Sequence, residues 1–137
     1  MMMRFLDTSV LLYSISTAAD EAAKRAVSAE ILDRDDCALS VQVLQEFYVQ
    51  AVRPTRSSPI PHGTAAGLIR TWLRFEVQDT TVAILQAALE IREAHGFSYW
   101  DSAIIAAARS LGCGELYTED LSHGREIDGV TIVNPYR

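Results

Sequence analysis

Short apolar segments alternate with helix-forming segments along most of the chain, and this alternation constrains the fold more than any other feature of the sequence. The segments that predict strands are Phe5–Leu6, Cys37–Leu39, the region of Val77, Glu115–Thr118 and Val130–Val133. Helical patterns cover residues 20–34 and run from Ser40 to about Arg53. A third begins at Thr64, a fourth runs from Thr80 or Thr81 to Ala94, and a fifth runs from Ser98 to Leu111. Strands that alternate with helices predict a parallel sheet covered on both faces. The expected fold class is therefore α/β, a three-layer α/β/α sandwich around a central, mainly parallel sheet.

Length and composition predict one domain. A chain of 137 residues, of which 49% are hydrophobic, is long enough for one core and short for two, so residues 1–137 are expected to form a single domain. The Pro- and Ser-rich stretch from Pro54 to Gly63 is predicted to be a loop within it. The longest apolar run, Ala103 to Ala108, is far shorter than the roughly 18 residues of a membrane span. The two cysteines form no zinc motif, which fits free thiols in the cytoplasm.

The net charge of −6 argues against a protein that coats nucleic acid through general electrostatics, since that binding mode uses many Lys and Arg contacts to phosphate. It does not exclude a nuclease, because a carboxylate site contributes negative charge itself and a bound cation reverses the local sign. The chain contains no GxSxG, GxGxxG or P-loop motif. The sequence thus argues against serine hydrolases and nucleotide-binding proteins that use these motifs.

Four acidic residues that are far apart in sequence occupy unusual positions. Asp7 and Asp120 follow predicted strands. Glu46 interrupts an apolar helical segment, and Asp101 lies in the first turn of a predicted helix. In parallel α/β sheets, ligands bind where the strands end and the following helices begin. We therefore expect Asp7, Asp101 and Asp120 to lie at the same edge of the sheet.

Each acid also has a simpler explanation. Asp101 is three residues after Ser98, which is the spacing of a capping box. Asp120 fits a turn, Asp7 fits an Asx-turn, and Glu46 fits a solvated helix residue. A capping role for Asp101 is compatible with metal binding.

Gathered in one place, the four carboxylates would form a site for a hard divalent cation. Two carboxylates about 4 Å apart repel by about 4 kcal/mol at an effective dielectric constant near 20. Mg²⁺ prefers oxygen ligands and commonly binds one or two carboxylates together with water. The matching chemistry is phosphoryl transfer, in which the metal polarises phosphate oxygens and lowers the pKa of the attacking water.

The segments DTSVLLY, QEFYV, SYWDSAIIAAA and YTEDLSHG surround the four acids in this order. The pattern resembles the PIN domain, and within it the VapC-like ribonuclease toxins of type II toxin–antitoxin systems, from Phe5 to about Asn134. The resemblance implies a Rossmann-like sandwich that binds Mg²⁺ or Mn²⁺ and hydrolyses RNA phosphodiester bonds by metal-activated water. It also implies a VapB-like antitoxin as partner, in a homodimer or a toxin–antitoxin hetero-oligomer, and no membrane partner.

The resemblance also implies roles for individual residues. Asp7, Asp101 and Asp120 match the acids that bind the metal, and Glu46 matches a helix glutamate that acts through water on the metal. The supporting residues that it implies are Thr118, Thr8 and Ser9.

Two residues near Asp120, Glu119 and Ser122, bear on which carboxylates bind metal. Many relatives carry a further acid where this chain has Ser122, which argues against a second metal site built on a fifth carboxylate. Glu119 competes with Asp120 as a ligand, but alternation along an extended segment directs Glu119 away from the face shared by Thr118 and Asp120. We therefore expect Asp120 to be the ligand.

The sequence leaves other interpretations open. Tyr99 and Trp100 fit either stacking on RNA bases or, more commonly for aromatics at a helix start, packing in the core or a lid. A noncatalytic RNA-binding or assembly module of the same fold is an alternative function. A receiver-like phosphotransfer domain is a weaker one, because such sites need a well-placed Lys and Lys24 falls in the middle of an early predicted helix.

Overall fold

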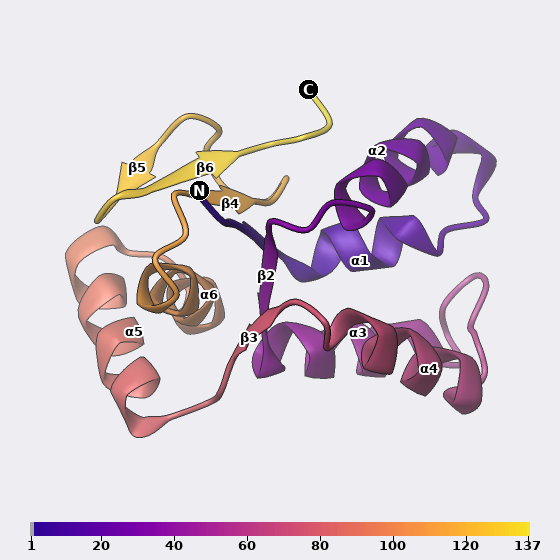
Figure 1. Cartoon of the computed structure of the whole chain (residues 1–137), viewed down its shortest axis with the longest axis horizontal. Helices are drawn as coiled ribbons and strands as arrows, with labels where there is room; N and C mark the ends of the chain where they lie inside the picture. Colours follow the sequence, from indigo (N-terminus) through magenta and orange to yellow (C-terminus); the bar gives the residue numbers. More distant parts are fainter. Residues whose placement is uncertain (1) are drawn as a thin grey trace.

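In the computed structural model, which describes residues 2–137, six strands form one central sheet (Figure 1). The strands are β1 (Arg4–Leu6), β2 (Cys37–Ser40), β3 (Glu76–Gln78), β4 (Glu115–Tyr117), β5 (Glu126–Ile127) and β6 (Val130–Val133). Their order is β3-β2-β1-β4-β6-β5, and every pair is parallel except β5 with β6. The central strand β1 places Phe5 beside both Ala38 and Leu116. These three side chains are fully buried, as expected of a parallel sheet covered on both faces.

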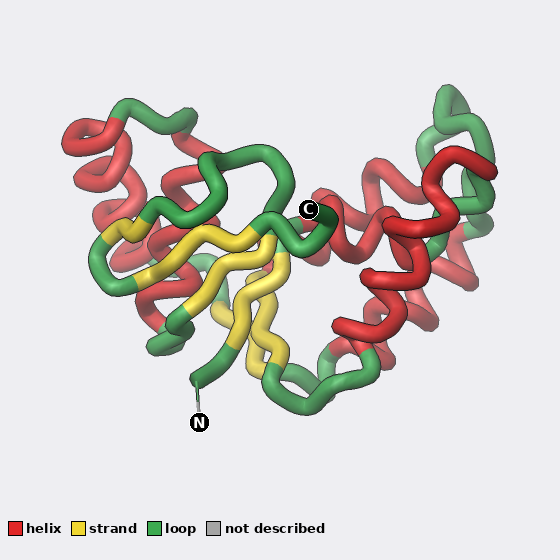
Figure 2. The backbone as a smooth tube through the Cα atoms, turned by 90° about the horizontal axis from the view of Figure 1, so that it is seen from above, coloured by secondary structure: helices red, strands yellow, loops and turns green. Residues whose placement is uncertain are grey.

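Helices cover both faces of this sheet. They are α1 (Thr8–Ser14), α2 (Ala22–Leu32), α3 (Val41–Val52), α4 (His62–Trp72), α5 (Val82–His95) and α6 (Tyr99–Ser110), and a short 3-10 turn, η1 (Ala19–Glu21), precedes α2. Figures 1 and 2 show α5 and α6 on one side and α1 to α4 on the other. The α/β/α sandwich with a mainly parallel sheet is confirmed.

The edge where the parallel strands end is the edge at which the candidate residues lie. Leu6 at the end of β1 is in register with Tyr117 at the end of β4. The pairing continues beyond the strands, because the backbone N–H of Asp7 donates to the carbonyl of Tyr117 at 3.0 Å. Asp7 and Thr118 thus leave the sheet side by side.

Local side-chain chemistry sets several helix boundaries. The hydroxyls of Ser40, Thr81 and Ser98 each accept a backbone N–H from the first turn of α3, α5 and α6. Gly96 ends α5 with φ of 76°, a conformation that favours glycine. The predictions of helix starts at these capping residues are confirmed.

Other local predictions are wrong. Thr8 and Ser9 begin α1, a helix that the sequence patterns did not predict, because the Asp7 carboxylate caps the helix and Val10 and Leu11 pack into the core. Helix α4 begins at His62, directly after Pro61, and not at a Thr64 cap. The short strand β5 was not predicted, and it pairs with β6 through a tight turn at Asp128 and Gly129, which both have positive φ.

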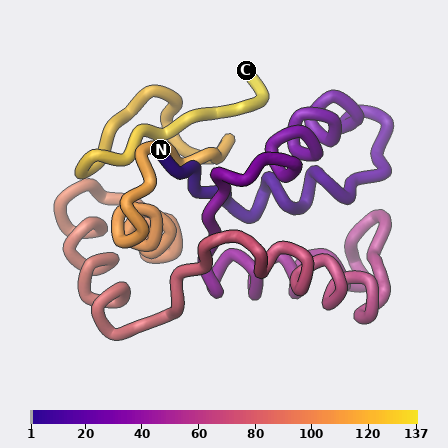
Figure 3. The backbone as a smooth tube through the Cα atoms, viewed as in Figure 1, coloured from indigo at the N-terminus to yellow at the C-terminus, as the bar shows by residue number. Residues whose placement is uncertain are grey.

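The chain between α3 and α4 forms the predicted loop, and it reaches across to the connection between α1 and α2 (Figure 3). The Thr17 hydroxyl donates to the Ser58 hydroxyl at 2.8 Å, which joins the two segments. No helix within residues 2–137 is long and apolar enough to cross a membrane.

Candidate active site

The carboxylate of Asp7 lies at the centre of the candidate site, where β1 ends and α1 begins. Asp7 is only 7% exposed. Its Oδ1 accepts the backbone N–H of Thr8 at 2.7 Å, so Asp7 caps α1. Its Oδ2 accepts the hydroxyl of Thr118 at 2.7 Å. The buried carboxylate is therefore held in one orientation by two donors from different elements.

Thr118 joins Asp7 to Asp120. The Thr118 side chain is 1% exposed, and its hydroxyl oxygen accepts the backbone N–H of Asp120 at 3.1 Å while its proton is donated to Asp7. One buried hydroxyl thus fixes the segment after β4 relative to the end of β1. Asp120 itself is exposed at the surface above them.

Glu46 is held close to Asp7 by Thr8, the residue directly after Asp7. The hydroxyl of Thr8 donates to Glu46 Oε2 at 3.1 Å. On the other side, the amide of Gln42 donates to Glu46 Oε1 at 2.8 Å, which is an i,i+4 contact within α3. The same amide nitrogen lies 3.2 Å from the carbonyl of Trp100 at the start of α6. Gln42 therefore links the glutamate to the helix that carries Asp101.

Asp101 lies in the first turn of α6, half-buried, with its backbone N–H donating to the Ser98 hydroxyl at 3.1 Å. This bond from the backbone of Asp101 to the Ser98 hydroxyl is one of the two bonds of a capping box, and it fixes the position of the residue. The side chain adds negative charge next to Asp120, as the pKa values show.

The pKa values connect the four acids. Burial raises the pKa of Asp7 to about 6, against the hydrogen bonds from Thr118 and Thr8, which lower it, and the negative charges of Asp120 and Glu46 raise it further. Burial also raises the pKa of Asp120, and the charges of Glu119 and Asp101 add to that rise. Asp7 thus lies near Glu46 and Asp120, and Asp120 lies near Asp101, although each acid comes from a different part of the chain.

Comparison with known families decides the class of fold that carries this site. The family model of the PIN domain matches residues 4–125. The chain belongs to the PIN domain family. No curated protein matches this sequence.

Solved structures show the same fold at low sequence identity. A toxin–antitoxin complex from Klebsiella pneumoniae has a TM-score of 0.71 and 19% identity, covering 97% of this PIN domain chain and 98% of that chain. The sarcin–ricin loop cleaving toxin VapC20 of Mycobacterium tuberculosis has a TM-score of 0.66 and 21% identity, covering 85% and 91%. VapBC2 from Rickettsia felis, bound to a DNA fragment from its promoter, has a TM-score of 0.64 and 18% identity, covering 96% and 97%.

The donor set of this PIN domain fits a hard cation. In residues 2–137 no three His, Cys, Asp or Glu side chains stand close enough together to hold one metal ion in the present side-chain arrangement. The four acids are nevertheless all oxygen donors, and repulsion among their negative charges adds to the pKa rise that burial causes at Asp7 and Asp120. A divalent cation relieves that repulsion, and oxygen ligands are those that Mg²⁺ and Mn²⁺ prefer.

Glu119 is turned away from the acids. Its Oε1 accepts the hydroxyl of Tyr13, and its Oε2 lies 2.9 Å from the ammonium of Lys24. These two contacts lower the pKa of Glu119 against the opposing effect of burial. The orientation expected from strand alternation is the one observed. Because Lys24 is occupied by Glu119, it does not serve the acid site as a receiver-like mechanism would require.

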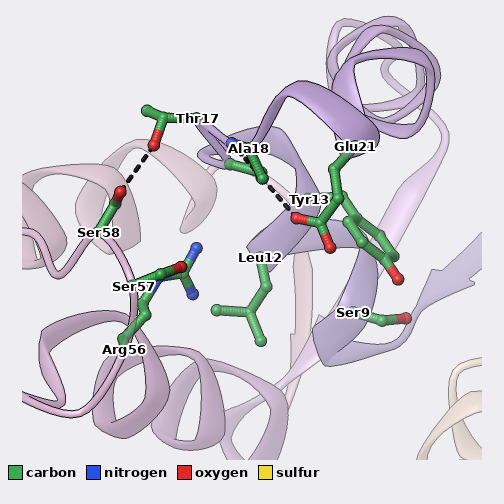
Figure 4. A pocket seen from close by; sticks show the side chains of 10 residues that line it. Ser9, Leu12, Tyr13, Thr17, Ala18, Glu21, Arg56, Ser57 and Ser58 are labelled. Carbon is green, nitrogen blue, oxygen red and sulfur yellow. Dashed lines mark hydrogen bonds between the residues drawn. The ribbon is translucent and has the colours of Figure 1, made fainter.

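Ser9 faces a different part of the molecule from Thr8. Its hydroxyl has no hydrogen-bond partner within the described residues, and it lines a cleft of about 310 Å³ between α1 and the loop that contains Arg56 (Figure 4). Thr8 and Thr118 contact the acids, whereas Ser9 contacts none of them through a hydrogen bond. Sequence reasoning missed Gln42, although its position four residues before Glu46 was the available signal.

Proposed function

We propose that this PIN domain is a Mg²⁺- or Mn²⁺-dependent endoribonuclease and the toxin of a type II toxin–antitoxin pair. The observation that carries the proposal is the carboxylate of Asp7, whose pKa is raised to about 6 by burial and, to a smaller extent, by the charges of Asp120 and Glu46. Keeping a carboxylate in such a place costs stability, which a functional role explains. The family match supports nuclease chemistry.

The chain's own residues divide the task. Asp7, Asp101 and Asp120 would hold the cation, which when bound polarises phosphate oxygens and lowers the pKa of water. Thr118 orients the carboxylates of Asp7 and, through the backbone, of Asp120. Glu46, held by Thr8 and Gln42, orients the attacking water toward the scissile phosphate. The hydrogen bonds that already hold the carboxylates of Asp7 and Glu46 preorganise these two side chains for the reaction.

The proposed partner is a small VapB-like antitoxin. Support comes from the solved structures with this fold, which include a toxin–antitoxin complex from Klebsiella pneumoniae and VapBC2 from Rickettsia felis with promoter DNA. The net charge of −6 suits an Arg-rich antitoxin segment that covers the acidic site. A homodimer or a toxin–antitoxin hetero-oligomer in the cytoplasm would be the working assembly.

The test is cleavage of cellular RNA by the purified protein with Mg²⁺, with Mn²⁺ and with chelator. We expect cleavage only with a divalent cation, and loss of at least about a hundredfold in rate for Asp7→Asn, because that variant removes a central ligand charge. Asp20→Asn, which removes one exposed acid at η1, is the matched control and should cleave normally. Undiminished cleavage by Asp7→Asn would refute the assignment. Binding of RNA without cleavage would favour the noncatalytic module.

A further inference from the structure

The indole of Trp100 is exposed at the edge of the acid site. Trp100 is 63% exposed, whereas the other tryptophan, Trp72, is 4% exposed and packs edge-on against Phe47. Tyr99 supports the indole from one side, with ring centroids 5.0 Å apart at 79°. The sequence favoured packing in the core or a lid for this aromatic pair, and the core part of that prediction is wrong for Trp100. An exposed indole directly before Asp101 has a face free for a ligand.

Uncharged amides surround this indole. Gln42 and Gln45 from α3 share with Trp100 the lining of a shallow depression of about 350 Å³. The same three residues, together with Gln78 at the end of β3, line a narrower neighbouring pocket of about 160 Å³. Within the part of the chain that the structure describes, neither lining includes a Lys or Arg, and the charges that they do include are the carboxylates of Glu46 and Asp79. A surface of this kind repels phosphate.

Amides beside an aromatic ring suit a nucleobase. Every base offers a face that stacks on an aromatic side chain. The edge of an unpaired base carries both donors and acceptors, which a Gln amide can match with two hydrogen bonds. Of the four glutamines in the two linings, which include Gln50, Gln42 already donates to Glu46 and to the backbone carbonyl of Trp100, so it holds the start of α6. The amide of Gln78 donates one N–H to the Asp79 carbonyl at 3.1 Å. Gln45, together with the second N–H and the carbonyl oxygen of the Gln78 amide, is left to contact the base.

We propose that Trp100 stacks on an unpaired RNA base next to the scissile phosphate, and that Gln45 and Gln78 bind the edge of that base. This inference rests on the proposed ribonuclease function, since it names the part of the substrate that the same site recognises. Glu46 connects the two, because it lines the depression under Trp100 and hydrogen-bonds Thr8 beside Asp7. The cleaved phosphodiester bond would thus lie next to a base that Trp100, Gln45 and Gln78 recognise.

A second copy of the chain is the competing occupant. Val82, Leu85 and Leu89 are exposed along α5, and Leu85 also lines the narrower pocket. The base is favoured because the lining around Trp100 is rich in amides and adjoins the catalytic acids, whereas a dimer contact needs neither.

The first experiment measures single-turnover cleavage of short single-stranded RNAs that carry each base, or no base, beside the cut. The wild type should cleave the abasic RNA about tenfold or more slowly than the best base-bearing RNA, as expected for the loss of one stacked base. Trp100→Leu should cleave both at the same slow rate, and Gln45→Leu with Gln78→Leu should change which base is preferred. Leu89→Ala, an exposed apolar change outside both pockets, should keep the wild-type pattern.

The outcomes separate the alternatives. If Trp100→Leu keeps the difference between base-bearing and abasic RNA, the stacking inference is overturned. It is equally overturned if Trp100→Leu dissociates a dimer, seen by mass in solution, and slows every RNA by the same factor.

If the wild type cleaves no RNA at all, the proposed ribonuclease function is rejected. A second experiment then tests base stacking on Trp100 separately, by binding. Because Trp72 is buried, quenching of intrinsic fluorescence on addition of RNA reports on Trp100. Asp7→Asn should show quenching with base-bearing RNA and little with abasic RNA, and the double variant with Trp100→Phe should show neither. Equal quenching by both RNAs rejects the base subsite.

Discussion

At the scale of single residues, the buried position of Asp7 lowers the stability of the fold and places a carboxylate in the proposed metal site. The carboxylate is buried, yet it keeps two hydrogen-bond donors that favour its charged form. Burial outweighs them, and the pKa rises from 3.8 to about 6. The folded state therefore binds the Asp7 proton more tightly than the unfolded chain does, and it loses stability as the pH rises between these two values.

This linkage predicts that Asp7→Asn is more thermally stable than the wild type at neutral pH without divalent cations. The rise in pKa corresponds to a cost of about 3 kcal/mol, fully present above pH 6 and absent below about pH 4. Melting curves in chelator at pH 7.5 and pH 4 would measure it. The variant should melt several degrees higher at pH 7.5 and at a similar temperature at pH 4. The same difference at both pH values would contradict the linkage.

Thr118→Val tests the hydroxyl that joins Asp7 to Asp120. The change keeps the shape of a side chain that is almost fully buried but removes its bonds to both residues. We expect activity to fall about 10- to 100-fold, the usual effect of losing a group that orients a metal ligand. Because this hydrogen bond lowers the pKa of Asp7, the acid limb of the pH–rate profile should move to higher pH. Thr118→Ser, which keeps the hydroxyl, should restore most of the rate and the original profile.

At the scale of elements, the start of α6 sets the position of Asp101. Ser98→Ala removes the hydroxyl that accepts the Asp101 N–H, and losing such a cap costs about 1 kcal/mol. We expect a lower urea midpoint and a higher Mg²⁺ concentration for half-maximal cleavage. Gly96→Ala is the matched control, since an alanine at φ of 76° costs a similar amount at the end of α5. If both variants show the same Mg²⁺ requirement, the effect of Ser98 is on stability alone.

Several helix starts could be predicted from the sequence, whereas contacts between distant elements could not. The caps at Ser40, Thr81 and Ser98 were predictable because they depend on residues three positions apart. Helix α1 was missed, since its seven residues are mostly apolar and its cap depends on the conformation of Asp7. The four acids could be proposed as a site from the sequence, because they follow predicted strands, interrupt an apolar helix or lie in a first helical turn. The contacts of Gln42 with Trp100 and of Lys24 with Glu119 join residues 58 and 95 positions apart, so only the packing of elements reveals them.

At the scale of the whole molecule, one core protects both thiols. Burial raises the pKa of Cys37 and Cys113 to about 11, and the two side chains are 1% and 3% exposed. Since the thiolate is the reactive form, we predict that the folded protein reacts with Ellman's reagent at pH 8 at least about a hundredfold more slowly than the protein in denaturant. Two thiols per chain should then be released in denaturant. Rapid reaction of one thiol in the native protein would show that the core opens locally.

The sheet order has a consequence for the time course of synthesis. Strand β1 is made first and lies in the middle of the sheet, yet its neighbour β4 is made more than 100 residues later, as the separation of 111 positions between Asp7 and Thr118 shows. Until β4 has left the ribosome, Asp7 lacks the hydroxyl that orients it, and one side of β1 has no strand beside it. A copy of the proposed nuclease whose synthesis has not yet reached β4 therefore lacks the oriented Asp7 carboxylate, and we expect it to be inactive.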